Sequence, residues 1–125
     1  MAVILVVEDN AANLKLAAFL LESAGHTVIS ATNAEMGVTL ARGEQPALIL
    51  MDIQLPGMDG LEATGLLKAD ASTRDIPVIA LTALAMKGDE ERIRAAGCDG
   101  YIAKPLSYKA FLGTVSSHLE SRASP

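Results

Sequence analysis

The chain has little of several residue types, and each scarcity excludes a class of protein. A single cysteine, Cys98, allows no internal disulfide and no cysteine-rich zinc site, which suits a reducing compartment. No apolar run approaches the roughly 20 residues of a membrane span. The N-terminus lacks the basic segment of a secretory signal peptide. We therefore expect a cytoplasmic protein without membrane insertion.

Basic residues and aromatic residues are also few. Lys and Arg number 10 against 15 Asp and Glu, which gives a net charge of −5. A broad nucleic-acid surface needs a basic face, so we expect no direct nucleic-acid partner. The sequence has no tryptophan, two phenylalanines and two tyrosines, although half of all residues are hydrophobic. The length of 125 residues therefore predicts one ordinary domain with an aliphatic core.

Short aliphatic segments alternate with stretches of helical character. Continuous apolar runs such as "VILVV" are typical of strands buried on both faces. The predicted strands are 3–7, 27–31, 47–51, 77–81 and 100–103. The predicted helices are 11–25, about 33–42, about 60–69, 86–97 and a last one with Phe111, Leu112, Val115 and Leu119 on one face. This (βα)₅ alternation predicts an α/β fold with a parallel sheet and helices on each side.

Polar residues mark the expected helix starts. Thr32 and Glu35 have the spacing of a capping box, in which the first side chain accepts from a backbone amide three residues on. The other expected N-cap residues are Asp9 or Asn10 for the first helix, Asp59 for the third and Ser107 for the last.

The residues that suggest chemistry follow the predicted strands. Open parallel sheets bind ligands beyond the carboxyl ends of their strands. The residues at these ends are Glu8, Asp9, Asp52, Thr82, Lys104 and Pro105. Each alone has a simpler interpretation as a cap, a turn residue or a surface residue. Asp52 is harder to dismiss, because "LILM" leads directly into it and an unpaired charge near a core is unfavourable.

Together, these residues favour phosphoryl chemistry. Three carboxylates at one edge repel each other and need a cation, and Mg²⁺ prefers one or two carboxylates with a phosphate oxygen. A carboxylate beside that ion can act as a nucleophile and form an aspartyl phosphate. Phosphoryl transfer needs mainly positioning and charge neutralisation, which Lys104 and Thr82 can supply. We expect Mg²⁺ as the cofactor, with Mn²⁺ as an alternative ion.

Four segments, "VVEDN", "LILMDIQLPGMDG", "IALTA" and "YIAKP", occur in the order and spacing of a bacterial response-regulator receiver domain. The sequence resembles that family over essentially its whole length. The segment "ALAMKGDEERIRAAGCDGYIAKP" further resembles single-domain receivers of the DivK-like or chemotaxis type. The resemblance implies a doubly wound, flavodoxin-like sheet of strand order 2-1-3-4-5. It also implies a receiver domain over 1–121, and we expect a disordered tail over 122–125.

The same resemblance implies roles for the strand-end residues. Asp52 would be the phosphoacceptor, and Mg²⁺ would lie among Glu8, Asp9, Asp52 and the backbone carbonyl of Gln54. The remaining implied roles are a switch hydroxyl for Thr82, phosphate binding for Lys104, a switch aromatic for Tyr101 and a cis peptide bond between Lys104 and Pro105.

The implied function is a stand-alone response regulator. It would receive a phosphoryl group from a sensor histidine kinase or a histidine phosphotransfer protein. It would then control a downstream protein target through the face formed by the fourth helix, fifth strand and fifth helix. Such a protein is not an enzyme beyond its own phosphorylation and dephosphorylation. A receiver domain that belongs to a longer regulator or hybrid kinase stays an alternative.

Other function classes fit the sequence less well. Phosphatases and dehalogenases with an aspartate nucleophile usually place a second Asp two residues later as general acid, and here that residue is Gln54. A nucleotide-binding domain would need a glycine-rich turn where this chain has "VVEDNAAN". A receiver used only for interaction would have lost its acceptor, acid pair or lysine, and all are present.

Overall fold

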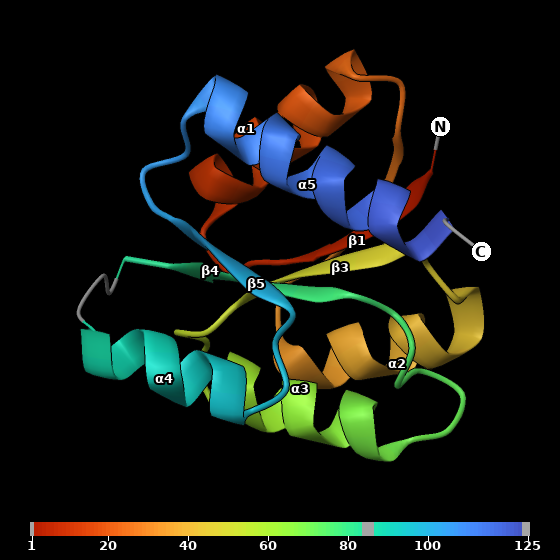
Figure 1. The fold of residues 1–125 in the computed structure, drawn as a ribbon, viewed down its shortest axis with the longest axis vertical. Coiled ribbons are helices and arrows are strands. Elements are labelled where there is room, and N and C mark those ends of the chain that lie inside the picture. Colours follow the sequence, from red (N-terminus) through yellow and green to blue (C-terminus); the bar gives the residue numbers. More distant parts are fainter. Residues whose placement is uncertain (1, 84–86, 124–125) are drawn as a thin grey trace.

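A five-stranded parallel sheet lies between two layers of helices in the computed structural model, which describes residues 2–83 and 87–123 (Figure 1). The strand order is β2-β1-β3-β4-β5. The strands are β1 (Val3–Val7), β2 (Thr27–Ala31), β3 (Leu48–Asp52), β4 (Val78–Thr82) and β5 (Gly100–Ala103). The helices are α1 (Ala11–Ser23), α2 (Ala34–Glu44), α3 (Gly60–Ala69), α4 (Lys87–Ala95) and α5 (Tyr108–Ala123). The predicted (βα)₅ fold and its strand order are therefore confirmed.

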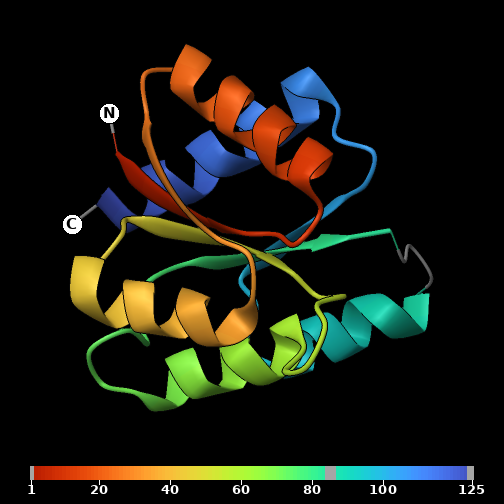
Figure 2. The same ribbon diagram turned by 180° about the vertical axis from the view of Figure 1, so that it is seen from behind.

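The helices divide between the two faces of the sheet. Figures 1 and 2 show α1 and α5 on one face and α2, α3 and α4 on the other. Successive strand residues point to opposite faces, so each central strand supplies both layers. Leu5 and Met51 pack towards α2 and α3, whereas Ile4 and Leu50 pack with Phe111 of α5. This packing on both sides makes the central strands a rigid support for whatever follows them.

The central strands end one residue later than the aliphatic pattern indicates. We predicted strands over 47–51 and 77–81, and β3 and β4 instead end at Asp52 and Thr82. Every residue of both strands is buried. The two polar residues are thus the last members of the sheet ladder and not the first members of loops. Within the described residues, no helix is both long and apolar enough to cross a membrane.

The N-cap predictions hold at two helices and fail at one. Asn10 and Asp59 cap α1 and α3, each with a side-chain oxygen that accepts from the backbone amide three residues later. The prediction of Thr32 as a cap is wrong. Asn33 caps α2 instead, since its Oδ1 accepts from the amide of Met36 at 2.8 Å. The cap must lie immediately before the first helical residue, and that residue is Ala34.

The later helices also differ from the predicted bounds. α4 ends at Ala95, two residues before Gly97. Gly97 has a φ of 107°, a backbone conformation that glycine commonly adopts just after the end of a helix. The predicted start at residue 86 lies outside the described residues. α5 begins directly after Ser107 and extends to Ala123, two residues into the segment expected to be a disordered tail. Arg122 and Ala123 are residues that helices accommodate readily, and the first proline of the segment is Pro125.

Candidate functional site

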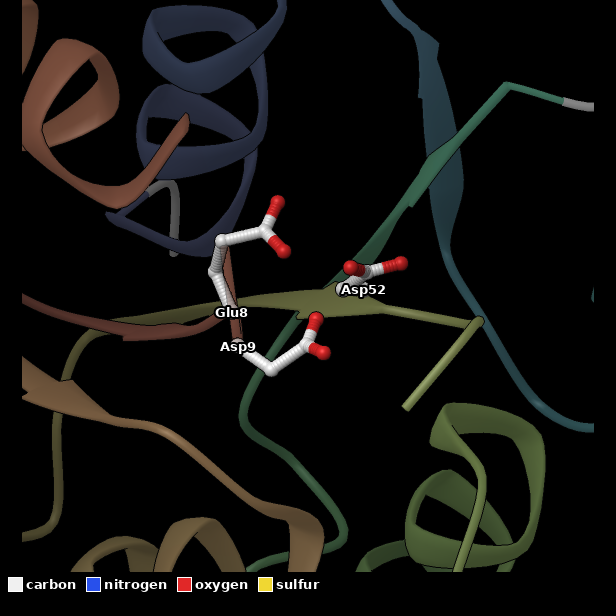
Figure 3. Close-up of side chains that lie close together, drawn as sticks. All are labelled: Glu8, Asp9 and Asp52. Carbon is white, nitrogen blue, oxygen red and sulfur yellow. The ribbon is translucent and has the colours of Figure 1, made fainter. Parts of the chain in front are cut away.

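The strand order brings the predicted site residues to one edge of the sheet. β1 and β3 are neighbours, so Glu8 and Asp9 emerge beside Asp52. One carboxylate oxygen from each residue can be chosen so that all three lie within 4.8 Å of one another. Figure 3 shows the three side chains converging from the ends of these two strands. Residues separated by more than forty positions in the sequence thus form one acidic cluster.

Lys104 brings one positive charge to this cluster. It follows β5, and its Nζ lies 3.0 Å from Oδ2 of Asp52 and 2.7 Å from Oε1 of Glu8. Its backbone N–H also donates to the carbonyl of Thr82 at 2.8 Å, which ties the ends of β4 and β5 together. The cluster of three carboxylates and one ammonium is therefore negative overall when all four groups are charged.

Asp52 is held in a defined orientation. Its side chain is buried, and its Oδ1 accepts the backbone N–H of Gln54 at 2.9 Å while Oδ2 accepts from Lys104. Each carboxylate oxygen has two acceptor positions, so neither oxygen is saturated by these bonds. The side chain of Asp9 is exposed, which leaves one side of the cluster open to solvent.

Burial makes the charged form of Glu8 unfavourable. Desolvation by burial is the largest cause that raises the pKa of Glu8, from 4.5 to about 7, and the hydrogen bonding and negative charge of Asp52 add to the rise. Lys104 and the backbone N–H of Asn10 oppose the rise only in part. Burial lowers the pKa of Lys104, but its ion pairs with Glu8 and Asp52 outweigh that effect and raise the pKa above its ordinary value. The cluster therefore favours an additional proton or cation.

The donor set fits a hard divalent cation. Glu8 Oε1 is buried and, although Lys104 is close, it has no hydrogen bond of good geometry among the described residues. The available ligand atoms are all oxygens, which are the ligands that Mg²⁺ prefers. The residues present are thus chemically suited to hold Mg²⁺ beside Asp52.

The remaining predicted residues lie around this cluster or at a distance from it. Thr82 is buried at the end of β4, and Gln54 is exposed two residues after the end of β3. The Lys104–Pro105 peptide bond is cis. Tyr101 is the second residue of β5, three positions before Lys104, and is half-buried against the core. Its hydroxyl donates to Oε2 of Glu90 in α4 at 3.3 Å.

Two further residues near the site carry no distinguishing signal in the sequence. Glu90 lies in the charged stretch "GDEER", which has the composition of any solvated helix face, so no signal in the sequence singles it out. Gly60 follows the cap Asp59 and resembles an ordinary turn glycine. Only the structure shows how closely it approaches the backbone of Asp52.

Comparison with known proteins gives a consistent result. The model of the "Response regulator receiver domain" family matches residues 4–116. The polar-differentiation response regulator DivK of Brucella anthropi is 53% identical over 116 residues, which are 93% of this chain and 94% of that protein. The protein of the same name in Brucella ovis is 52% identical with the same coverage.

Solved structures agree with these sequence matches. The receiver domain of a Pseudomonas aeruginosa sensor histidine kinase, solved with a magnesium ion coordinated in its active-site cleft, is 34% identical. It superposes with a TM-score of 0.89 over 95% of this chain and 98% of its own. The signal receiver domain of a Syntrophus aciditrophicus histidine kinase is 30% identical with a TM-score of 0.92, over 100% of this chain and 95% of its own.

The raised pKa of Glu8 predicts how the stability of the metal-free protein depends on pH. The folded chain holds this proton more tightly than the unfolded chain does. The resulting stabilisation is complete below pH 4.5 and is lost as the pH rises through about 7. Glu8→Gln has no proton to lose. In urea unfolding with a chelator, its free energy of unfolding relative to wild type should therefore increase between pH 5 and pH 8.

Exposed Glu44 provides a matched control, since Glu44→Gln removes one carboxylate far from the acidic cluster. Burial also lowers the pKa of His26, but this residue is the same in all three proteins, so its effect on stability cancels in the comparison. Parallel curves for Glu8→Gln and wild type would show that Glu8 is ionised in the folded protein over this range.

Proposed function

The chain belongs to the response regulator receiver domain family, and from this premise we propose that Asp52 accepts a phosphoryl group from a phosphohistidine. Receiver domains are response regulators and are generally not enzymes. Those of the DivK type interact with histidine kinases and with downstream targets. The donor we propose is a sensor histidine kinase or a histidine phosphotransfer protein, and the output is control of a partner protein.

One observation carries this proposal: the contact of Lys104 Nζ with Asp52 Oδ2 at 3.0 Å, beside the carboxylates of Glu8 and Asp9. The nucleophile, Asp52, and a cation that can pair with the transferred phosphoryl group, Lys104, are thus in place before any donor binds. This arrangement supplies the positioning and neutralisation on which phosphoryl transfer depends.

The residues would act as follows. A carboxylate oxygen of Asp52 attacks phosphorus, and the bond from phosphorus to the donor nitrogen breaks as the new P–O bond forms. The acyl phosphate that forms no longer carries the carboxylate charge, so Lys104 would pair with a phosphoryl oxygen instead, and the Thr82 hydroxyl can donate to another. Mg²⁺, or Mn²⁺, held by Glu8, Asp9, Asp52 and the Gln54 carbonyl, would neutralise phosphoryl charge.

An aspartate-dependent phosphatase is the rival enzymatic function, and it is not favoured. Such an enzyme needs a general acid close to its nucleophile. The residue two positions after Asp52 is Gln54, whose amide cannot donate a proton as an acid does. The self-catalysed steps that we propose, phosphorylation from a small donor and hydrolysis of the aspartyl phosphate, need no such residue.

Asp52→Asn should abolish Mg²⁺-dependent labelling by acetyl phosphate, because an amide is not a nucleophile at this step. Asp59→Asn is the matched control. It also removes a carboxylate close to the edge of the sheet but keeps a good N-cap for α3, and it should label as fast as wild type. Intact-protein mass spectrometry with peptide mapping measures both. A stable phosphoryl adduct on Asp52→Asn would refute the assignment.

The proposed output runs from Thr82 through Tyr101 to α4. The Tyr101 hydroxyl now bonds to Glu90, which also lies 3.5 Å from Arg94. Phosphorylation adds about −1.5 to −2 charge units at the end of β3. If Thr82 moves towards that charge, Tyr101 can turn into the vacated space and release Glu90. A local charge would thus bias a two-state contact on the α4-β5-α5 face.

Beryllofluoride, a stand-in for the phosphoryl group, should shift the amide NMR signals of Tyr101 and of α4 (87–95). In Thr82→Ala the signals around Asp52 should still move, while those of α4 should move much less. Thr27→Ala, at the exposed start of β2, should behave as wild type does. If the signals of α4 move equally in Thr82→Ala and wild type, the proposed coupling through Thr82 is wrong.

A further inference from the structure

Gly60 is packed directly against the backbone of the proposed phosphoacceptor. A Cβ atom built on Gly60 would lie 2.2 Å from the carbonyl oxygen of Asp52 and 2.8 Å from Cα of Ile53. Ordinary contacts of this kind begin near 3.4 Å. The atoms that obstruct a side chain are all backbone, so they have no rotamer by which to move aside. Only glycine allows α3 to begin this close to the end of β3.

Gly65, in the middle of the same helix, provides a comparison with Gly60. Gly65 lies on the exposed side of α3 with no heavy atom within 4 Å of a built Cβ. Alanine forms helices better than glycine at either position. The distinctive property of Gly60 is therefore the space that it leaves for the Asp52–Ile53 peptide.

Both partners in this contact are anchored. The Gly60 N–H donates a hydrogen bond to the carbonyl of Ile53 at 3.3 Å. The Gly60 carbonyl accepts a hydrogen bond from the buried Thr64 hydroxyl at 2.8 Å. α3 is fixed further by the fully buried Ala63 and Leu67. On the other side, the Ile53 N–H donates to the carbonyl of Leu81 in β4 at 3.2 Å.

We propose that Gly60 is a positioning residue, whose lack of a side chain sets where Asp52 and the Gln54 carbonyl stand relative to the acidic cluster. A Cβ at Gly60 must increase its distance from the Asp52 carbonyl from 2.2 Å to about 3.4 Å. If the peptide yields, Asp52 moves. If α3 yields, it pulls on residues 53–59, which carry the Gln54 carbonyl. A displacement of about 1 Å can reduce the rate of a positioned reaction by about 100-fold.

This inference rests on the proposed function, and the matched pair Gly60→Ala and Gly65→Ala tests it. Mg²⁺ affinity is measured by amide NMR on protein shown by circular dichroism to be folded. Phosphorylation by acetyl phosphate is then timed at saturating Mg²⁺. Gly60→Ala should bind Mg²⁺ at least about ten-fold more weakly and react about 100-fold more slowly. Gly65→Ala should match wild type in both. A folded Gly60→Ala with wild-type Mg²⁺ affinity and rate would overturn the proposal, even if its urea midpoint fell.

A second measurement does not depend on the folding of the variant. In wild-type protein, the Gly60 amide signal should shift with the same Mg²⁺ midpoint as that of Gln54, while the Gly65 signal should not move. A Gly60 signal that is insensitive to Mg²⁺ would also overturn the proposal. If wild type instead failed to form a phosphoryl adduct on Asp52, the proposed function would fail, and the Mg²⁺ titrations would still decide the role of Gly60.

Discussion

The site depends on the repulsion among three carboxylates that the sheet holds at one edge. Glu8, Asp9 and Asp52 cannot move apart, because β1 and β3 are neighbouring strands packed on both faces by aliphatic side chains. Lys104 compensates only part of the charge. The fold therefore leaves the cluster with uncompensated negative charge. A proton on Glu8 neutralises part of this charge, and a divalent cation would neutralise more of it.

The same constraint relates the site to its surroundings. A phosphoryl group on Asp52 would change the charge at the point where the ends of four strands meet, and the contacts there lead in two directions. Through β4 and β5, they lead to Tyr101 and its bond with Glu90 on α4. Through the turn after β3, they lead to Gly60 at the start of α3. We regard the first contact as adjustable, because Glu90 is partly exposed, and the second as fixed, because it joins backbone to backbone.

Much of the fold could be predicted from the sequence, because burial on both faces leaves continuous aliphatic runs and a parallel sheet aligns the ends of its strands. Residues such as Asp52 and Lys104 could be assigned to one edge for that reason. Finer features depend on three-dimensional contacts. Thr32 has the spacing of a cap, but the helix begins one residue too late for it. The approach of Gly60 to the Asp52 carbonyl and the bond between Tyr101 and Glu90 join segments whose spacing in the sequence has no periodic signal.

The central claim is that the acidic cluster, and not acidity in general, binds a divalent cation beside Asp52. An Mg²⁺ titration of Asp9→Ala against Asp75→Ala tests it most directly. Both variants lose one exposed carboxylate, but Asp75 precedes β4 and lies at the opposite edge of the sheet. The account predicts that Asp9→Ala weakens Mg²⁺ binding by at least about ten-fold, while Asp75→Ala binds as wild type does. Equal Mg²⁺ affinity in wild type and Asp9→Ala would contradict it.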